Sequence, residues 1–368
     1  MVSGTCRRRH GASIVLTSAL EYDLPRELVA TRPASPRDAA RLLVYRKSDA
    51  SIMHVHVRDL PGLLERGDLL VRNDTAVLHA RLQGQRGLDA HGRGGGRVDG
   101  LYVETIEEGL WLVMLTAGGR LREGECIALG PGLSLELVRK QDRHWVARPS
   151  CAASAADMLD GAGYTPLPPY ILKARNERGE VVDDADDRQW YRTLFADNAH
   201  RGSVAAPTAG LHLTQEVDNA LTQRGVDVAH VTLHVGEGTF RGIETDTLEA
   251  HAMHSERFSV DSTTVAQLQQ PRQGRLIAVG TTTTRLLESL PRSLPAAGIS
   301  ESTDLLIAPG HQWRWVNGLL TNFHLPRSTL LALVGAMVGM DNLRTIYAEA
   351  LEQRYRFYSY GDAMLILP

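Results

Sequence analysis

The sequence is poor in cysteine, with only Cys6, Cys126 and Cys151 in 368 residues. They lie far apart and form no Cys-x-x-Cys pair, which argues against a disulfide framework and against a cysteine zinc site. No apolar run approaches the roughly 18 residues that a membrane span needs. We therefore expect a protein of the reducing cytoplasm, with no membrane partner.

The chain also lacks an excess of charge of either sign. Its formal net charge is −3 at pH 7, and its isoelectric point is about 6.5. Such a balance gives no overall attraction to nucleic acid or to an anionic membrane. Any contact with RNA must therefore come from a local patch.

The N-terminus imitates a signal peptide, because Arg7–Arg9 precede the short apolar stretch "GASIVLTSAL". Serine and threonine interrupt that stretch, it has no clear small-x-small cleavage site, and it runs directly into "EYDLP". We expect residues 1–15 to form a flexible extension.

What the chain does have is enough apolar sequence for two cores. Its hydrophobic content is 43%, and single cores stop growing near about 250 to 300 residues. Between Leu69 and Val146, short apolar runs such as "DLLVRND", "LYVETI" and "LWLVMLTA" alternate with glycine-rich or charged turns. This spacing predicts a small antiparallel β-barrel.

Beyond residue 150 the pattern changes to strands alternating with helices. A helix is predicted from an N-cap at Thr214 to a stop at Gly225, and another from Asp261 or Ser262. "VDVAHVTLHVG" and "RLIAVG" are typical of strands, and the N-terminal segment has the same mixed character. The sequence thus predicts an α/β fold of two domains: an α/β layered catalytic domain from residues 16–72 and 151–368, and an inserted β-barrel domain at 73–150.

Several histidines suggest a metal site at first sight. "HAMHSE" spaces His251 and His254 three apart, which on a helix would place both rings on one face, with His212, His234 and His324 available to complete a site. The His-Glu-x-x-His pattern is absent, and the other histidines lie in apolar contexts where a hydrogen-bonded core histidine is the usual outcome. We expect no metal; a metallohydrolase is a distant alternative.

The stretch "LIAVGTTTTRLLESL" indicates an anion site. An apolar strand ends at Gly280 and meets four threonines, Thr281–Thr284, before a helix that carries Arg285 and Glu288. Ligands of α/β sheets bind at the carboxyl ends of strands, and a helix N-terminus offers free N–H groups to a phosphate or carboxylate. The alternative is a plain helix cap.

Two further loops, "VAAPTAGLH" and "LHVGEGTF", are rich in small residues that let a ligand approach the backbone. Their histidines, His212 and His234, are candidate acid or base groups; core packing is the alternative for both. Near the C-terminus, "RYRFYSYGDAML" interleaves aromatic residues with Arg354 and Arg356, a combination that can stack a base and hold a phosphate. A buried strand followed by an ordinary turn is the alternative there.

Nine segments together resemble the S-adenosylmethionine:tRNA ribosyltransferase-isomerase family of the queuosine pathway, in order from about Tyr22 to the C-terminus. The segments are "YDLPRELVATRPASPRDAARLLV", "GDLLVRNDTAVLHARLQG", "GYTPLPPYI", "GSVAAPTAGLHL", "VTLHVGEGTF", "HAMHSERF", "AVGTTTTRLLES", "TNFHLPRSTLLALV" and "YRFYSYGDAMLI".

The resemblance implies an unusual reaction. Enzymes of this family transfer the ribosyl part of S-adenosylmethionine to 7-aminomethyl-7-deazaguanine in the tRNA anticodon stem-loop and rearrange it, giving epoxyqueuosine and releasing adenine and methionine. S-adenosylmethionine is then a consumed substrate, and no other cofactor or metal is implied. The family fold, an α/β domain plus a β-barrel, agrees with the patterns above.

That reaction needs a base beside the sulfonium, an acid for the departing adenine, and carboxylates against the cationic groups. The candidate catalytic residues are His212, His234, His254, Glu256, His324 and Asp362. The candidate donor-binding residues are Thr208, Gly210, Gly236, Gly280, Thr281, Thr282, Thr283, Arg285, Tyr355 and Arg356. Which residue is the base and which the acid stays open.

The tRNA is expected to contact the barrel through Arg81, Arg86, Arg93 and Arg97; solvated loop charges are the alternative. Four positions depart from the family pattern: Asp99, Arg192, Thr284 and His311. They motivate a second hypothesis, in which the acceptor is a free deazapurine. A non-catalytic RNA- or nucleotide-binding protein is a third. We expect a monomer.

Overall fold

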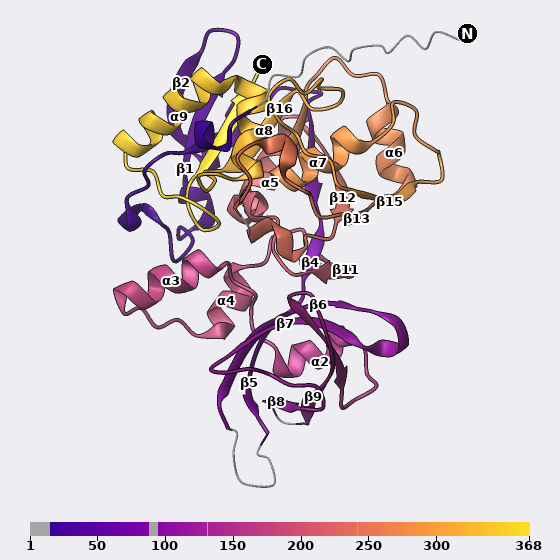
Figure 1. The fold of residues 1–368 in the computed structure, drawn as a ribbon. Helices are drawn as coiled ribbons and strands as arrows, with labels where there is room; N and C mark the ends of the chain where they lie inside the picture. Colours follow the sequence, from indigo (N-terminus) through magenta and orange to yellow (C-terminus); the bar gives the residue numbers. More distant parts are fainter. Residues whose placement is uncertain (1–14, 88–94, 131, 241) are drawn as a thin grey trace, which may run out of the picture.

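The computed structural model describes residues 15–87, 95–130, 132–240 and 242–368. The chain forms two bodies, an α/β body and a β-barrel, with a few helices where they meet (Figure 1). This confirms the predicted fold class. All but the last residue of the expected N-terminal extension lies outside the described residues.

The α/β body contains a nine-stranded sheet in the order β15-β13-β12-β3-β14-β16-β17-β1-β2. Strands β12, β3, β14 and β16 are parallel to one another, and the other pairings are antiparallel except β17 with β1. The strands are β1 (Arg41–Arg46), β2 (Ser51–His56), β3 (Leu69–Asn73), β12 (Asp227–Leu233), β13 (Glu256–Val260), β14 (Leu276–Val279), β15 (Ile299–Thr303), β16 (Gly318–Asn322) and β17 (Ala363–Leu367).

The run "DLLVRND" forms strand β3 of the large sheet: its spacing groups it with the barrel strands, whereas the predicted domain limits put residues up to 72 in the α/β domain. Strand β3 pairs with β12 and β14 inside the large sheet, and all five of its residues are buried. Leu69 and Val71 pack into the core on one face, and Leu70 into the core on the other. A continuous apolar run is what a strand covered on both faces requires.

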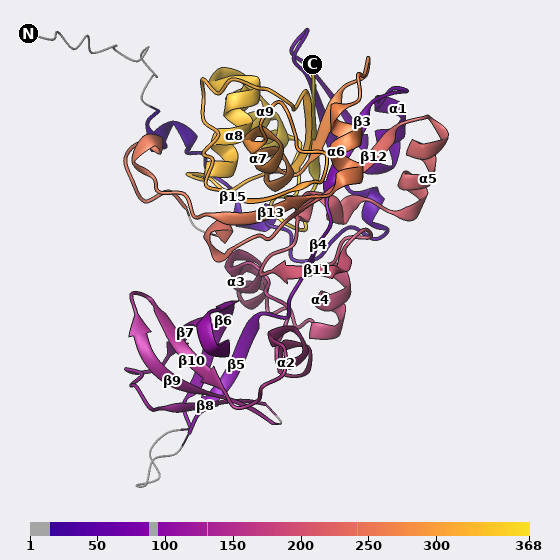
Figure 2. The same ribbon diagram turned by 90° about the vertical axis from the view of Figure 1, so that its right-hand side faces the viewer.

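Helices cover both faces of the sheet (Figure 2). One face carries α6 (Ser262–Gln269), α7 (Thr281–Ser289), α8 (Thr329–Val338) and α9 (Met340–Glu352). The other carries α1 (Leu60–Leu63) and α5 (Gln215–Gln223). The predicted N-caps of two helices are confirmed: Thr214 accepts a hydrogen bond from the Val217 N–H, and Asp261 accepts one from the Thr264 N–H.

The barrel is closed by six antiparallel strands in the order β10-β7-β6-β5-β8-β9. They are β5 (Arg81–Arg86), β6 (Arg97–Thr105), β7 (Trp111–Ala117), β8 (Cys126–Gly130), β9 (Leu133–Gln141) and β10 (His144–Pro149). Side chains such as Trp111, Val113 and Leu135 fill its core. The barrel is therefore a packed body.

Between the two bodies, β4 (Thr75–Val77) pairs with β11 (Asp197–Ser203) instead of joining the barrel. The helices α2 (Ala155–Ala162), α3 (Pro169–Arg178) and α4 (Asp184–Trp190) lie close by (Figures 1 and 2). Short 3₁₀ helices complete the chain: η1 (Thr17–Leu20), η2 (Arg26–Leu28), η3 (Arg37–Ala39), η4 (Val57–Asp59), η5 (Glu107–Gly109), η6 (Thr208–His212), η7 (Glu237–Phe240) and η8 (Leu248–Ala250). The domain limits predicted at 72/73 and 150/151 stay predictions.

Within the described ranges, no single helix is long and apolar enough to cross a membrane. Helices α8 and α9 reach that length only together, and they are bent by 112° where they join.

Candidate active site

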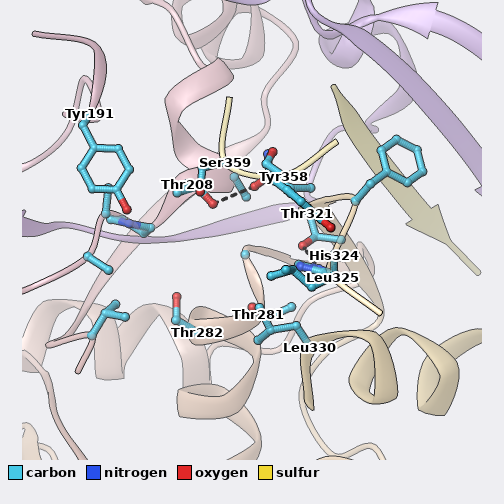
Figure 3. A pocket seen from close by; sticks show the side chains of 18 of the residues that line it. Tyr191, Thr208, Thr281, Thr282, Thr321, His324, Leu325, Leu330, Tyr358 and Ser359 are labelled. Carbon is cyan, nitrogen blue, oxygen red and sulfur yellow. Dashed lines mark hydrogen bonds between the residues drawn. The ribbon is translucent and has the colours of Figure 1, made fainter. Parts of the chain in front are cut away.

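A pocket lies at the carboxyl ends of the parallel strands β14 and β16, where ligands of α/β sheets usually bind (Figure 3). We call it the central pocket, and its empty space is about 630 Å³. Its lining residues are Tyr170, Tyr191, Ala205, Ala206, Pro207, Thr208, Ala209, Val235, Gly280, Thr281, Thr282, Thr321, Asn322, Phe323, His324, Leu325, Leu330, Tyr358 and Ser359.

The threonine run forms one wall of this pocket. The threonines were expected to precede a helix, but they are its first turn: α7 begins at Thr281. Thr283 and Thr284 are completely buried, and their hydroxyls donate to the carbonyls of Val279 and Gly280 at 2.7 and 3.0 Å. Only Thr281 and Thr282 face the pocket, so they offer hydroxyls beside the free N–H groups of the helix end.

Gly280 makes this turn possible. Its φ is +91°, a conformation that residues with side chains rarely adopt, and its N–H donates to the Leu320 carbonyl at 2.8 Å. The chain can therefore leave β14 and enter α7 in a single residue. The result is an anion-binding geometry suited to a carboxylate.

His324, just past β16, also lines the pocket and lies near Thr281 (Figure 3). Its Nε2 lies 2.9 Å from the Thr321 hydroxyl, and its backbone N–H donates to the Tyr347 hydroxyl at 2.9 Å. The Tyr22 hydroxyl donates to its carbonyl oxygen. Burial lowers the pKa of His324 to about 3. The ring is thus fixed in place and neutral at physiological pH.

His212 stands one layer behind the pocket wall. Its Nε2 lies 3.1 Å from the amide nitrogen of Asn322, which also donates to the Tyr358 carbonyl at 3.2 Å. The Thr208 hydroxyl donates to the Asn322 amide oxygen at 2.9 Å. Burial lowers the pKa of His212 to about 4. His212 therefore orients Asn322, which lines the pocket, and does not line it itself.

Three other candidate residues, near the C-terminus, lie away from the pocket. The Asp362 carboxylate accepts from the Arg356 N–H at 2.8 Å, from the Arg356 guanidinium at 3.1 Å and from the Arg41 N–H at 3.1 Å. The Tyr355 ring lies under Arg41, whose guanidinium carbon is 3.8 Å from the ring centroid. Asp362, Arg356 and Tyr355 thus stabilise the turn that precedes β17.

The same aromatic segment supplies two lining residues that the sequence analysis did not single out, Tyr358 and Ser359. Asn322, Phe323 and Tyr191 were missed as well. The many aromatic residues of "RYRFYSYG" were a signal for Tyr358 and Ser359. Gly210, in contrast, faces the protein: a Cβ there would lie 2.5 Å from the Phe195 ring.

A second pocket, which we call the junction pocket, lies where the barrel meets the sheet and has about 1040 Å³ of empty space. It contains four of the candidate residues, His234, Gly236, His254 and Glu256. Val235 lines both pockets, so the two are neighbours. The junction pocket is lined by Val103, Glu104, Leu112, Arg143, His144, Gly202, Val204, His234, Val235, Gly236, Glu237, Gly238, His254, Ser255, Glu256, Arg257 and Ser302.

Ion pairs fix the loop that separates the two pockets. His144 Nε2 lies 3.1 Å from both carboxylate oxygens of Glu237, and Arg143 donates to one of them at 3.2 Å. Glu256 Oε1 accepts from the Gly236 N–H at 3.1 Å, and Oε2 pairs with Arg285 at 2.6 Å. Residues 235–237 are therefore held by the barrel on one side and by α7 and β13 on the other.

Arg285 was expected to bind the donor, but the structure places it elsewhere. Its guanidinium binds Glu256 and the Leu305 carbonyl, at 2.6 and 3.1 Å, and Arg285 is not among the residues lining the central pocket. Arg285 and Glu256 are both buried.

The histidine geometry also differs from the helical spacing considered above. Residues 251–255 form no helix, so His251 and His254 do not share a helical face. His234 Nδ1 lies 3.1 Å from the Thr75 hydroxyl, and burial lowers the pKa of His234. Among the residues that the structure describes, no group of three or more His, Cys, Asp or Glu side chains is placed to hold a metal ion.

Three of the four barrel arginines expected to contact tRNA have acidic neighbours within the barrel. Arg97 Nε lies 2.9 Å from Asp99, Arg81 lies 4.0 Å from the same carboxylate, and Arg86 pairs with Glu125. Arg93 lies outside the described residues. Two carboxylates, Asp99 and Glu125, therefore compensate part of the positive charge of these three arginines.

The positions that depart from the family pattern lie outside the central pocket. Asp99 pairs with Arg97 on the barrel, and Arg192 donates to Asn198 at 3.0 Å. His311 lies 3.1 Å from the buried Glu288. Thr284, the fourth of these positions, does not line the pocket, but its hydroxyl donates to the carbonyl of Gly280, which does.

The chain was compared with known proteins. A family model described as queuosine biosynthesis protein matches residues 17–366. Proteins named S-adenosylmethionine:tRNA ribosyltransferase-isomerase from Ruegeria pomeroyi and Synechococcus elongatus are 44% and 42% identical, each over 95% of this chain and over 99% and 95% of their own lengths. The one from Legionella pneumophila (strain Lens) is 40% identical over 94% of this chain and 98% of its own.

Among solved structures, the S-adenosylmethionine tRNA ribosyltransferase of Thermotoga maritima matches with a TM-score of 0.53 and 32% identity. The match covers 95% of this chain and 100% of that one. This chain belongs to the family of queuosine biosynthesis proteins whose members include the S-adenosylmethionine:tRNA ribosyltransferase-isomerases.

Proposed function

We propose that this chain transfers the ribosyl part of S-adenosylmethionine to 7-aminomethyl-7-deazaguanine in a tRNA anticodon stem-loop and isomerises it to epoxyqueuosine, releasing adenine and methionine. The observation that carries this proposal is the central pocket, which is lined by a helix N-terminus with two threonine hydroxyls and by a neutral histidine. Family membership supplies the reaction.

The donor binds in the central pocket with its methionine carboxylate at the N-terminus of α7. Thr281 and Thr282, rather than Arg285, serve this carboxylate, because Arg285 is engaged by Glu256. The residues lining the pocket include no Asp or Glu. Four aromatic residues line it instead, Tyr170, Tyr191, Phe323 and Tyr358, and aromatic rings attract a sulfonium as in other cation–π sites.

His324 is the proton acceptor in this proposal. A base must remove a proton made acidic by the adjacent sulfonium, and His324 is the imidazole that lines the central pocket. His212 and Asn322 are positioning residues that hold the wall on which the donor lies. S-adenosylmethionine is consumed as a substrate, with no further cofactor.

We also propose that the chain acts as a monomer, because both pockets are formed within a single chain. We propose that it acts in the cytoplasm, because its three widely spaced cysteines suit a reducing compartment.

Release of adenine tests the proposed function. Purified protein is incubated with S-adenosylmethionine and an anticodon stem-loop that carries either guanine or 7-aminomethyl-7-deazaguanine. Release that requires the modified stem-loop is expected. Release with the free deazapurine alone would assign the chain to a small-molecule pathway, and binding of S-adenosylmethionine without release under any condition would make it a binding protein.

A further inference from the structure

The two pockets stand in the relation that a transfer between two substrates requires. Reacting atoms must approach to about 3–3.5 Å before a bond forms, so donor and acceptor sites have to adjoin. Val235 forms part of both walls, and Gly236 and Glu237 continue into the junction pocket. A donor in the central pocket therefore has the junction pocket as its neighbour across this short loop.

The junction pocket has charged groups that the central pocket lacks. Glu104, on the barrel strand β6, is exposed and forms no ion pair among the described residues, and the same holds for Arg257 on β13. A free carboxylate attracts an ammonium group, and a free guanidinium attracts a phosphate. The pocket thus offers one group for each charge of a nucleotide that bears an aminomethyl substituent.

Its construction from both bodies fits a nucleotide that belongs to a larger RNA. The barrel strands supply Val103, Glu104, Leu112, Arg143 and His144, the connecting segment around β11 supplies Gly202 and Val204, and the α/β body supplies the other lining residues. Enzymes that modify a base take it out of its stack into a pocket while the rest of the nucleic acid stays outside. A pocket at the seam between two bodies leaves the surfaces of both free for the stem.

We propose that the junction pocket is the acceptor site. In it, Glu104 pairs with the aminomethyl ammonium of the target base, and Arg257 pairs with the phosphate of the same nucleotide. This assignment rests on the proposed function, because it takes the acceptor from that reaction. Recognition of the acceptor then depends on these two free charges, whereas the barrel arginines Arg81, Arg86 and Arg97 already have acidic neighbours.

The test uses Glu104→Gln and Arg257→Gln in the full chain. Both side chains are exposed, so the fold is expected to persist. Each variant should raise the KM for the modified stem-loop by about tenfold or more, which is typical for the loss of one charged hydrogen bond, and leave the KM for S-adenosylmethionine within about twofold. Glu123→Gln is the matched control, because Glu123 is an exposed carboxylate in a different cavity of the barrel.

A binding experiment isolates the ammonium contact. Wild-type protein should bind the 7-aminomethyl stem-loop more tightly than a stem-loop carrying 7-methyl-7-deazaguanine, and Glu104→Gln should remove this preference. A merely structural effect of Glu104→Gln would weaken both RNAs alike and leave the preference in place, which would overturn the assignment.

The two proposals fail in different ways. If wild-type protein releases no adenine with the modified stem-loop, the proposed function is wrong. If wild-type protein turns over but both variants keep the KM for the stem-loop, or raise only the KM for S-adenosylmethionine, the junction pocket is not the acceptor site and the proposed function stands.

Discussion

The central pocket and the junction pocket share the wall residue Val235 but are built in different ways. The central pocket lies within the α/β body, at the ends of strands β14 and β16, and its lining is aromatic, small and free of carboxylates. The junction pocket needs the barrel as well, and carboxylate, guanidinium and imidazole groups line it. The difference suggests a preformed donor site and an acceptor site that depends on how the two bodies meet.

The largest expected effect comes from removing the histidine that distinguishes the central pocket. His324→Gln keeps a polar side chain but cannot take up a proton, so adenine release should fall by at least about a hundredfold. Single-turnover adenine release measures this, and calorimetric binding of S-adenosylmethionine shows that the pocket is intact. Turnover within a few-fold of wild type would remove His324 as the proton acceptor.

Acid should destabilise the central-pocket side of the molecule. Burial lowers the pKa of His324 to about 3 and of His212 to about 4, so in the range between these values and about 6.5 protons bind mainly to the unfolded chain. The free energy of unfolding is therefore fully retained above about pH 6.5 and falls below it, by up to about 1.4 kcal/mol per pH unit for each histidine.

Urea denaturation between pH 7 and 5 measures this slope. In His324→Gln, the free energy of unfolding should depend less steeply on pH, because only His212 of the two buried histidines remains to contribute. His254→Gln, which changes an exposed histidine of the junction pocket, is the control. An equal slope in wild type and His324→Gln would contradict the expected burial of a neutral ring.

The threonine wall should affect only the donor. Thr282→Val removes a hydroxyl that faces the central pocket and keeps the shape of the side chain. The Kd for S-adenosylmethionine should rise by about tenfold, whereas the affinity for the modified stem-loop should stay the same. Thr222→Val, on an exposed face of α5, provides the control. If Thr282→Val lost affinity for the stem-loop alone, the central pocket would bind the acceptor and not the donor.

The smallest effect is expected for a barrel arginine that already has an acidic partner. Arg97 is paired with Asp99, so Arg97→Gln should change the affinity for the stem-loop, and its dependence on salt, by less than about twofold. Filter binding at several salt concentrations measures both. A large decrease in the salt dependence would show that Arg97 leaves Asp99 for a phosphate, which would support the prediction from sequence that this arginine contacts the tRNA.

The sequence alone determined several helices and strands and the turn at the end of β14. Periodicity and capping residues are local, so the helix capped by Thr214, the helix capped by Asp261 and the strand before Gly280 follow from neighbouring residues. The same reasoning failed for "DLLVRND", because a short apolar run has no period that shows which sheet it joins.

Only the tertiary structure decided which candidate side chains face a ligand. His212, Asp362 and Arg285 are polar residues within family segments, but partners far away in sequence engage them: Asn322 for His212, Arg41 for Asp362 and Glu256 for Arg285. A buried polar group must be satisfied by whatever the fold brings near it. Whether such a group binds substrate or holds a wall is therefore set by long-range contacts, which no local pattern in the sequence records.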